Sequence, residues 1–109
     1  MLLSSSSLTG NDVKNPSGDS LGKIEDMMID TRTGAVAYCV LSFGGIFGVF
    51  DKLFAVPMPV LTVDTDDKCF VLNESKERLE GAPGFDKDNW PDHSDLGWRQ
   101  TVDDYYRVR

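Results

Sequence analysis

The sequence predicts a small, mostly β domain: a β-barrel of about six strands with a short C-terminal helical extension packed on it. Three observations support this fold class. Short apolar runs alternate at close spacing with turns rich in glycine and proline, which is typical of small barrels and curled sheets. Residues 35–43 are apolar on both faces of the expected strand, so both faces must be covered. The length of 109 residues suits one domain.

Three β-hairpins are expected from the turn-forming residues. Their turns are Asn15–Gly18, Thr31–Gly34 and Asp64–Lys68. The arms that they join are 8–14 with 21–24, 24–29 with 35–43, and 60–63 with 69–72. A further strand over 53–56 ends at Pro57, and a second proline follows at once. Proline has no backbone N–H to donate, so this strand is expected at a sheet edge or a corner.

The chain changes character after Leu72. Ser75 is expected to cap a short helix over 76–80, and a second helix should run from Ser94 or Asp95 through Tyr106. One face of the second helix carries large apolar residues at helical spacing: Trp98, Val102, Tyr105 and Tyr106. This face must cover the barrel or a second copy of the protein. We therefore divide the chain into a flexible N-terminal tail (1–7), a β-barrel domain (8–74) and a loop and helical extension packed on the barrel (75–109).

Charge and composition disfavour several classes of protein. The chain has 18 acidic and 11 basic residues, a formal net charge of −7, which repels nucleic-acid backbones and anionic lipid surfaces. No apolar run approaches the roughly 18–20 residues of a membrane span, and the first residues do not resemble a signal peptide. We therefore expect a cytoplasmic protein. Cys39 and Cys69 lie far apart in apolar runs and are expected to be buried thiols.

The motifs that suggest catalysis or metal binding fail on spacing. The run Asp92–Asp95 has the residue types of a hydrolase triad, but working triads bring residues from different segments together. The run Asp64–Lys68 lacks the later ligands of a calcium loop. The glycine-rich run Gly44–Gly48 lacks the lysine of a phosphate loop, so we expect a tight turn or an apolar tip. His93 is the only histidine, which excludes a histidine-rich metal site. We predict neither an enzyme nor a metal or cofactor site.

Short motifs in a fixed order resemble the PRC-barrel family over nearly the whole chain beyond about residue 8. They are Gly10–Val13, Asn15, Gly18, Leu21–Asp26, Asp30–Gly34, Tyr38–Phe43, Gly44–Gly48, Asp51–Pro57 and Leu61–Val63. The tail is similar to that of short stand-alone bacterial members through Leu79, Ala82–Phe85, Trp90–Pro91, Trp98 and Tyr105–Tyr106.

The resemblance implies an open, small β-barrel that serves as a binding module and supplies no catalytic residues. The same barrel occurs in the cytoplasmic domain of the photosynthetic reaction-centre H subunit and in the C-terminal domain of a ribosome maturation factor. The expected function is a non-enzymatic protein-interaction or scaffolding module of unassigned pathway. A fold alone does not specify a partner.

We expect this module to self-associate, with a homodimer as the favoured assembly and nucleic acid disfavoured as a partner. Apolar residues of the glycine-rich tip and aromatic residues of the tail are the expected contacts: Ile46, Phe47, Phe50, Trp90 and Trp98. Two alternatives stay open. The barrel mouth could bind a small apolar, quinone-like ligand, or the protein could be an accessory factor in ribosome or RNA processing.

Overall fold

The computed structural model describes residues 2–43, 52–66, 69–86, 88–92 and 95–108. Strands hold 41% of these residues and helices 23%, so the predicted mostly β class is confirmed. The strands are β1 (Asp12–Lys14), β2 (Ser20–Asp30), β3 (Ala35–Phe43), β4 (Lys52–Pro57), β5 (Leu61–Asp64), β6 (Cys69–Leu72) and β7 (Gly84–Phe85). The helices are α1 (Ser5–Leu8), the 3-10 turn η1 (Met58–Val60), α2 (Lys76–Glu80) and α3 (Leu96–Tyr105).

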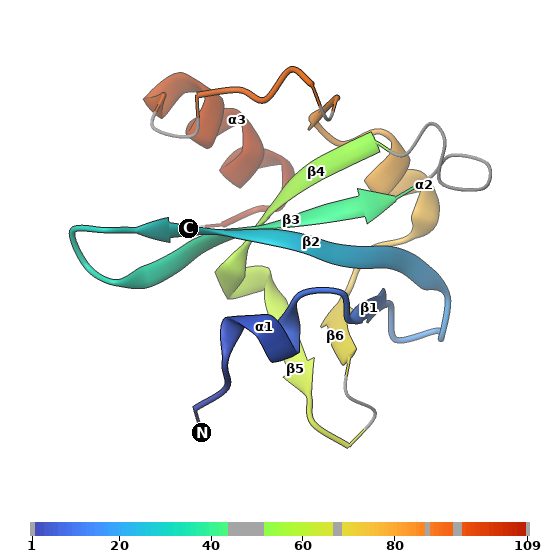
Figure 1. Ribbon diagram of the computed structural model, residues 1–109. Coiled ribbons are helices and arrows are strands. Elements are labelled where there is room, and N and C mark those ends of the chain that lie inside the picture. The colour runs from blue at the N-terminus through green and yellow to red at the C-terminus, as the bar shows by residue number, and fades with distance from the viewer. Residues whose placement is uncertain (1, 44–51, 67–68, 87, 93–94, 109) are drawn as a thin grey trace.

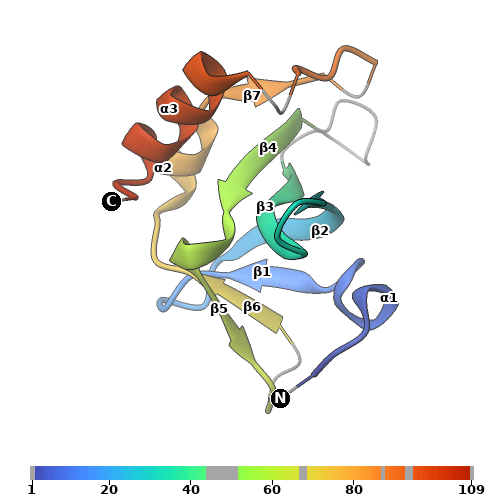
Figure 2. The same cartoon turned by 90° about the vertical axis from the view of Figure 1, so that its left-hand side faces the viewer.

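All seven strands belong to one curled sheet in the order β5-β6-β1-β2-β3-β4-β7. Neighbours pair antiparallel except β1 and β6, which run parallel with Val13 opposite Phe70. This pairing joins the β5–β6 hairpin to the start of the chain (Figure 1). The sheet does not close, and β5 and β7 form its edges. Helices α2 and α3 lie together beside β4 and β7 (Figure 2).

Most predicted elements are confirmed, and the differences have local causes. The predicted strand over 8–14 begins only at Asp12, because a serine-capped helical turn, α1, precedes it. The structure adds a seventh strand, β7, in a segment that we expected to be a loop. Pro57 ends β4 and η1 turns the corner to β5, as the two prolines predicted. The proposed division at residues 8 and 75 stays a prediction.

Strand β3 is buried on both faces, as its composition predicted. Residues Tyr38–Leu41 are each 3% exposed or less. In the register with β4, Cys39 lies opposite Val56 and Leu41 opposite Phe54, while Val40 pairs with Ala55 on the other face. One face therefore closes the barrel interior, and the other must be covered from outside.

Helix α3 supplies that outer cover. Val102 is fully buried and Tyr106 is 5% exposed, and the half-buried Trp98 and Tyr105 pack against the same core. The ring of Trp98 lies 5.8 Å from that of Tyr38 on β3, measured between centroids. Of the two surfaces that the apolar helix face could cover, it covers the chain's own sheet.

Helix α3 is fastened to α2 through Arg78 and Tyr105. The Arg78 guanidinium donates to the Tyr105 carbonyl oxygen, and the Tyr105 hydroxyl donates to the Arg78 carbonyl oxygen. The guanidinium carbon also lies 3.8 Å from the centre of the Tyr105 ring, and Glu74 pairs with Arg78 at 3.4 Å. These contacts fix the position of α3 over the sheet.

The close approach of the β2 backbone to the β3 backbone at Gly22 generates the first prediction. Gly22 has a φ of +99°, and a Cβ there would lie 2.0 Å from the Ser42 carbonyl oxygen. Gly22→Ala should therefore lower the free energy of unfolding by more than about 2 kcal/mol, from backbone strain and a clash with the backbone. Urea denaturation measures the loss. Gly34→Ala is the matched control, because its φ is +78° but nothing lies within 4 Å. Equal losses in the two variants would contradict this account.

Two tyrosines generate a second prediction: Tyr106, at the C-terminal end of α3, and Tyr38, on β3 against the helix. The buried Tyr106 hydroxyl has no hydrogen-bond partner among the described residues, whereas the Tyr38 hydroxyl donates to Asp103 at 3.2 Å. Tyr106→Phe should raise the free energy of unfolding by up to about 1–3 kcal/mol, because it removes an unsatisfied polar group. Tyr38→Phe should lower it by about 0.5–1.5 kcal/mol. Parallel urea titrations measure both, and a loss of stability in Tyr106→Phe would refute the packing described here.

Candidate functional site

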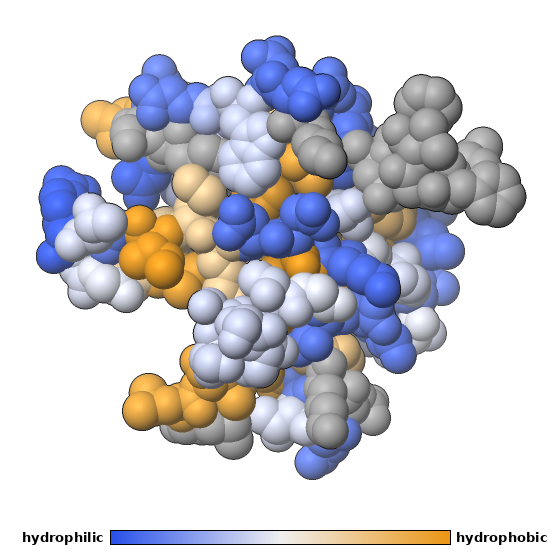
Figure 3. Space-filling view, viewed as in Figure 1, coloured by the Kyte–Doolittle hydropathy of each residue, from blue (hydrophilic) through white to orange (hydrophobic). Residues whose placement is uncertain are grey.

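A surface cleft of about 570 Å³ lies between the end of the β2–β3 hairpin and the start of α3. We call it the hairpin–helix cleft. Its lining comes from the hairpin, from β3 and from α3: Met28, Ile29, Asp30, Thr31, Arg32, Ala37, Tyr38, Leu96 and Arg99. Apolar surface appears beside the hairpin at the left of Figure 3. The cleft lies outside the barrel, so it is not the barrel mouth that we considered for a small ligand.

The hairpin wall is held by Asp30. Its carbonyl oxygen accepts from the Gly34 N–H at 2.7 Å, and its carboxylate accepts from the Arg32 N–H at 2.9 Å. The carboxylate also meets the Arg32 guanidinium at 3.5 Å. The backbone hydrogen bond from Arg32, followed by its side-chain hydrogen bond, lowers the pKa of Asp30. The turn residues thus give the wall a fixed carboxylate beside an exposed guanidinium.

The opposite wall begins at the first residue of α3. The Asp95 carboxylate accepts from the Trp98 N–H at 2.9 Å and so caps the helix. This cap places Leu96 at the helix start, where its side chain is 77% exposed. Ile29 on the hairpin wall is 55% exposed. Each wall therefore presents one large apolar side chain to solvent.

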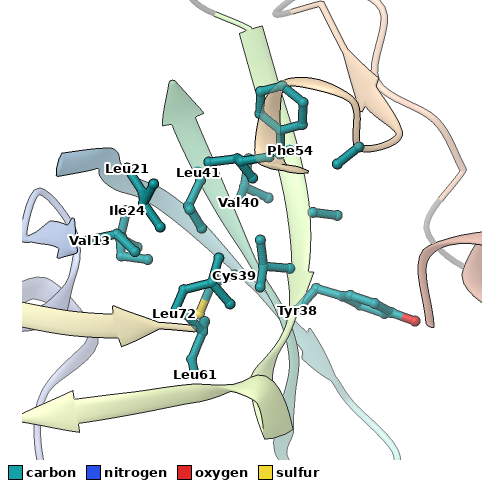
Figure 4. Packing of buried hydrophobic residues seen from close by; sticks show 14 of the residues in the cluster. Val13, Leu21, Ile24, Tyr38, Cys39, Val40, Leu41, Phe54, Leu61 and Leu72 are labelled. Atoms are coloured by element: carbon teal, nitrogen blue, oxygen red, sulfur yellow. The ribbon is translucent and has the colours of Figure 1, made fainter. Parts of the chain in front are cut away.

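Tyr38 and α3 form the polar floor of the cleft. Figure 4 shows the Tyr38 side chain pointing away from Cys39 and the barrel interior. Its hydroxyl donates to Asp103 and accepts from the Arg99 Nε–H at 3.5 Å. Burial is the largest cause that raises the pKa of Tyr38, and the nearby Asp103 carboxylate adds to it. The hydroxyl therefore stays protonated near neutral pH and offers hydrogen bonds, not a base.

The groups that catalysis would need are not gathered at this cleft. Among residues 2–43, 52–66, 69–86, 88–92 and 95–108, no three His, Cys, Asp or Glu side chains are placed to share a metal ion. Asp95 of the triad-like run caps α3, and His93 and Ser94 lie outside the described residues. Both cysteines are free and buried, as predicted, and burial raises the pKa of Cys39 to about 11. The cleft offers apolar contact and hydrogen bonds, which suit binding.

The structure places the predicted contact residues as follows. Ile46, Phe47 and Phe50 lie outside the described residues. Trp90 is 38% exposed, with its ring 5.2 Å from that of Phe85, and Trp98 packs on Tyr38 behind the cleft. Neither tryptophan lines the cleft, and their role as contacts stays a prediction.

Sequence reasoning predicted none of the residues that line the cleft, and Ile29 and Leu96 are the large exposed apolar residues among them. The pairing of β2 with β3 shifts register between Met28 and Ile29, so simple alternation does not say which way Ile29 points. Leu96 lies off the apolar face that Trp98 and Val102 define. A large apolar residue away from that face was the signal that could have identified it.

Comparison with known protein families agrees with the single curled β-sheet of the fold. No described helix has the length and apolar character to cross a membrane. No curated protein matches the chain. The family model for the PRC-barrel domain matches residues 2–79, which covers the whole sheet except β7. The chain therefore belongs to the PRC-barrel domain family.

Proposed function

We propose that this protein is a non-catalytic protein-interaction module that self-associates through the hairpin–helix cleft. The observation that carries the proposal is the exposure of Ile29 and Leu96, at 55% and 77%, on the two walls of one cleft. Complete burial of a fully exposed side chain of this kind contributes roughly 1.5–3 kcal/mol. Burial of the parts of Ile29 and Leu96 that are still exposed would contribute a corresponding share of that free energy. Large apolar side chains that share a concave surface are typical of interaction sites.

The polar lining favours a polypeptide as the occupant. Arg32 lies beside Asp30, and Arg99 shares the Tyr38 hydroxyl with Asp103, so each arginine has an acidic neighbour. A polypeptide can meet such a surface with both donors and acceptors along its backbone. The same pairing gives the cleft no surplus positive charge for an RNA backbone, which argues against the RNA-processing alternative.

Net charge sets the conditions for association. Two copies that each carry a formal charge of −7 repel one another at long range. Added salt screens this repulsion but hardly affects apolar contact, so association through the cleft should strengthen with ionic strength. We also keep Trp90, Ile46, Phe47 and Phe50 as proposed contacts of this association.

The volume of the cleft supports a second candidate function, the binding of a small apolar ligand. A volume of about 570 Å³ falls within the range of roughly 300–1,000 Å³ that is usual for ligand pockets. Ligand binding in this cleft needs no second copy of the chain. A strict monomer that binds an apolar probe would therefore favour this second function.

Replacement of Leu96 tests the proposal. In sedimentation velocity between about 1 and 100 µM, the wild-type chain should show a mass above that of its 12.1 kDa monomer as concentration rises. Leu96→Glu should weaken association about tenfold or more, because it removes an apolar contact and adds a charge. The helix itself should be preserved, because a carboxylate in the first turn favours the helix dipole.

Two further variants complete this experiment. Ile29→Thr keeps a strand-forming residue and removes most of the apolar surface, so it should weaken association in the same direction. Thr101→Glu adds the same charge at an exposed position of α3 outside the cleft lining, and it should associate like wild type. A wild-type protein that is a strict monomer at about 100 µM would disprove self-association.

A further inference from the structure

We propose that Leu2 and Leu3 of a second copy occupy the hairpin–helix cleft. We call these two residues the leucine arm. The inference rests on the proposed self-association and names the segment that makes the contact. It predicts that copies associate head to tail, arm into cleft, and not cleft against cleft.

The exposed apolar side chains are the first support. Among the described residues, the large apolar side chains that are exposed are Leu2, Leu3, Ile29, Trp90 and Leu96. Two belong to the arm, at 99% and 47% exposure, and two belong to the cleft. A projecting apolar pair and a concave apolar site on the same chain are complementary in shape and chemistry.

The base of the arm is anchored, which limits the ordering needed on binding. Ser4 caps α1 through its hydroxyl, which accepts from the Ser7 N–H at 3.3 Å. The Asn11 side chain donates to the Ser7 carbonyl oxygen at 3.0 Å, and Leu8 packs against the core. The arm therefore projects from a fixed turn, so its base needs little further ordering in the complex.

The position of the arm requires a second molecule. The N-terminal end lies at the bottom of both Figure 1 and Figure 2, and α3 lies at the top. Figure 3 shows apolar surface at the lower left, apart from the apolar surface beside the hairpin. A contact that joins two different surfaces is heterologous, so it forms a closed ring if the rotation closes and a growing chain if it does not.

A mixing experiment tests the inference. Leu96→Glu keeps the arm but has an impaired cleft, whereas the double variant Leu2→Ser, Leu3→Ser keeps the cleft but has no apolar arm. Both should fold normally, because the changed side chains are exposed or half-exposed. In sedimentation velocity at about 100 µM, each variant alone should be monomeric. Their equimolar mixture should form a complex with the mass of two chains, since only one arm–cleft pair remains intact.

The alternative outcomes separate this inference from the proposed function. If the arm double variant associates like wild type while Leu96→Glu does not, the arm is wrong and self-association through the cleft stands. If each variant is monomeric but the mixture forms no complex, arm-to-cleft contact is likewise excluded. If wild type itself is a strict monomer, the proposed function fails and the inference fails with it. Thr101→Glu alone is the matched control for the added charge, and it should associate like wild type.

Discussion

The burial of β3 on both faces is the constraint on which the rest of this structure depends. Residues Tyr38–Leu41 are withdrawn from water on both sides of the sheet, so the protein needs an apolar layer inside the barrel and another outside it. The inside layer comes from the curl of the sheet itself. The outside layer cannot come from the same sheet, because the outer face of a curled sheet points away from its own strands. Helix α3 provides this outer layer, and Val102 and Tyr106 pack in the same core as the residues of β3 and β4, which would otherwise be exposed to water.

The cleft is a consequence of that arrangement. Helix α3 packs beside β4 and reaches β3 through the contact of Trp98 with Tyr38, while the β2–β3 hairpin extends beyond the start of the helix (Figure 1). The overhang leaves a concave surface between Leu96 and Ile29, with the Tyr38 hydroxyl on its floor. Arg78 and Tyr105 hold α3 to α2, so this shape is built into the packing and does not depend on a ligand. A preformed concave surface of this kind lowers the cost of ordering side chains when a partner binds.

The family and the site lead to the same class of function from different directions. PRC-barrel membership gives a small β module that is generally non-catalytic. The cleft is the surface through which we propose that such a module makes contact. The net charge of −7 adds a repulsion between copies that self-association must overcome. In this arrangement apolar side chains would supply the attraction, and the paired charges of Asp30 with Arg32 would limit which segments fit.

The sequence by itself determined the features that depend on neighbouring residues. The turns at Asn15–Gly18 and Thr31–Gly34, the two-faced β3, the cap at Ser75, a helix start at Ser94 or Asp95 and the apolar face of α3 all follow from local chemistry. Only the tertiary structure decided the parallel pairing of β1 with β6, the addition of β7 and the position of α3 above the hairpin. These depend on contacts between segments far apart in the chain. The cleft belongs to this second group, because Ile29 and Leu96 form one site only in the folded chain. The register shift between Met28 and Ile29 sets where Ile29 points, and the packing of α3 brings Leu96 to the other side of the cleft.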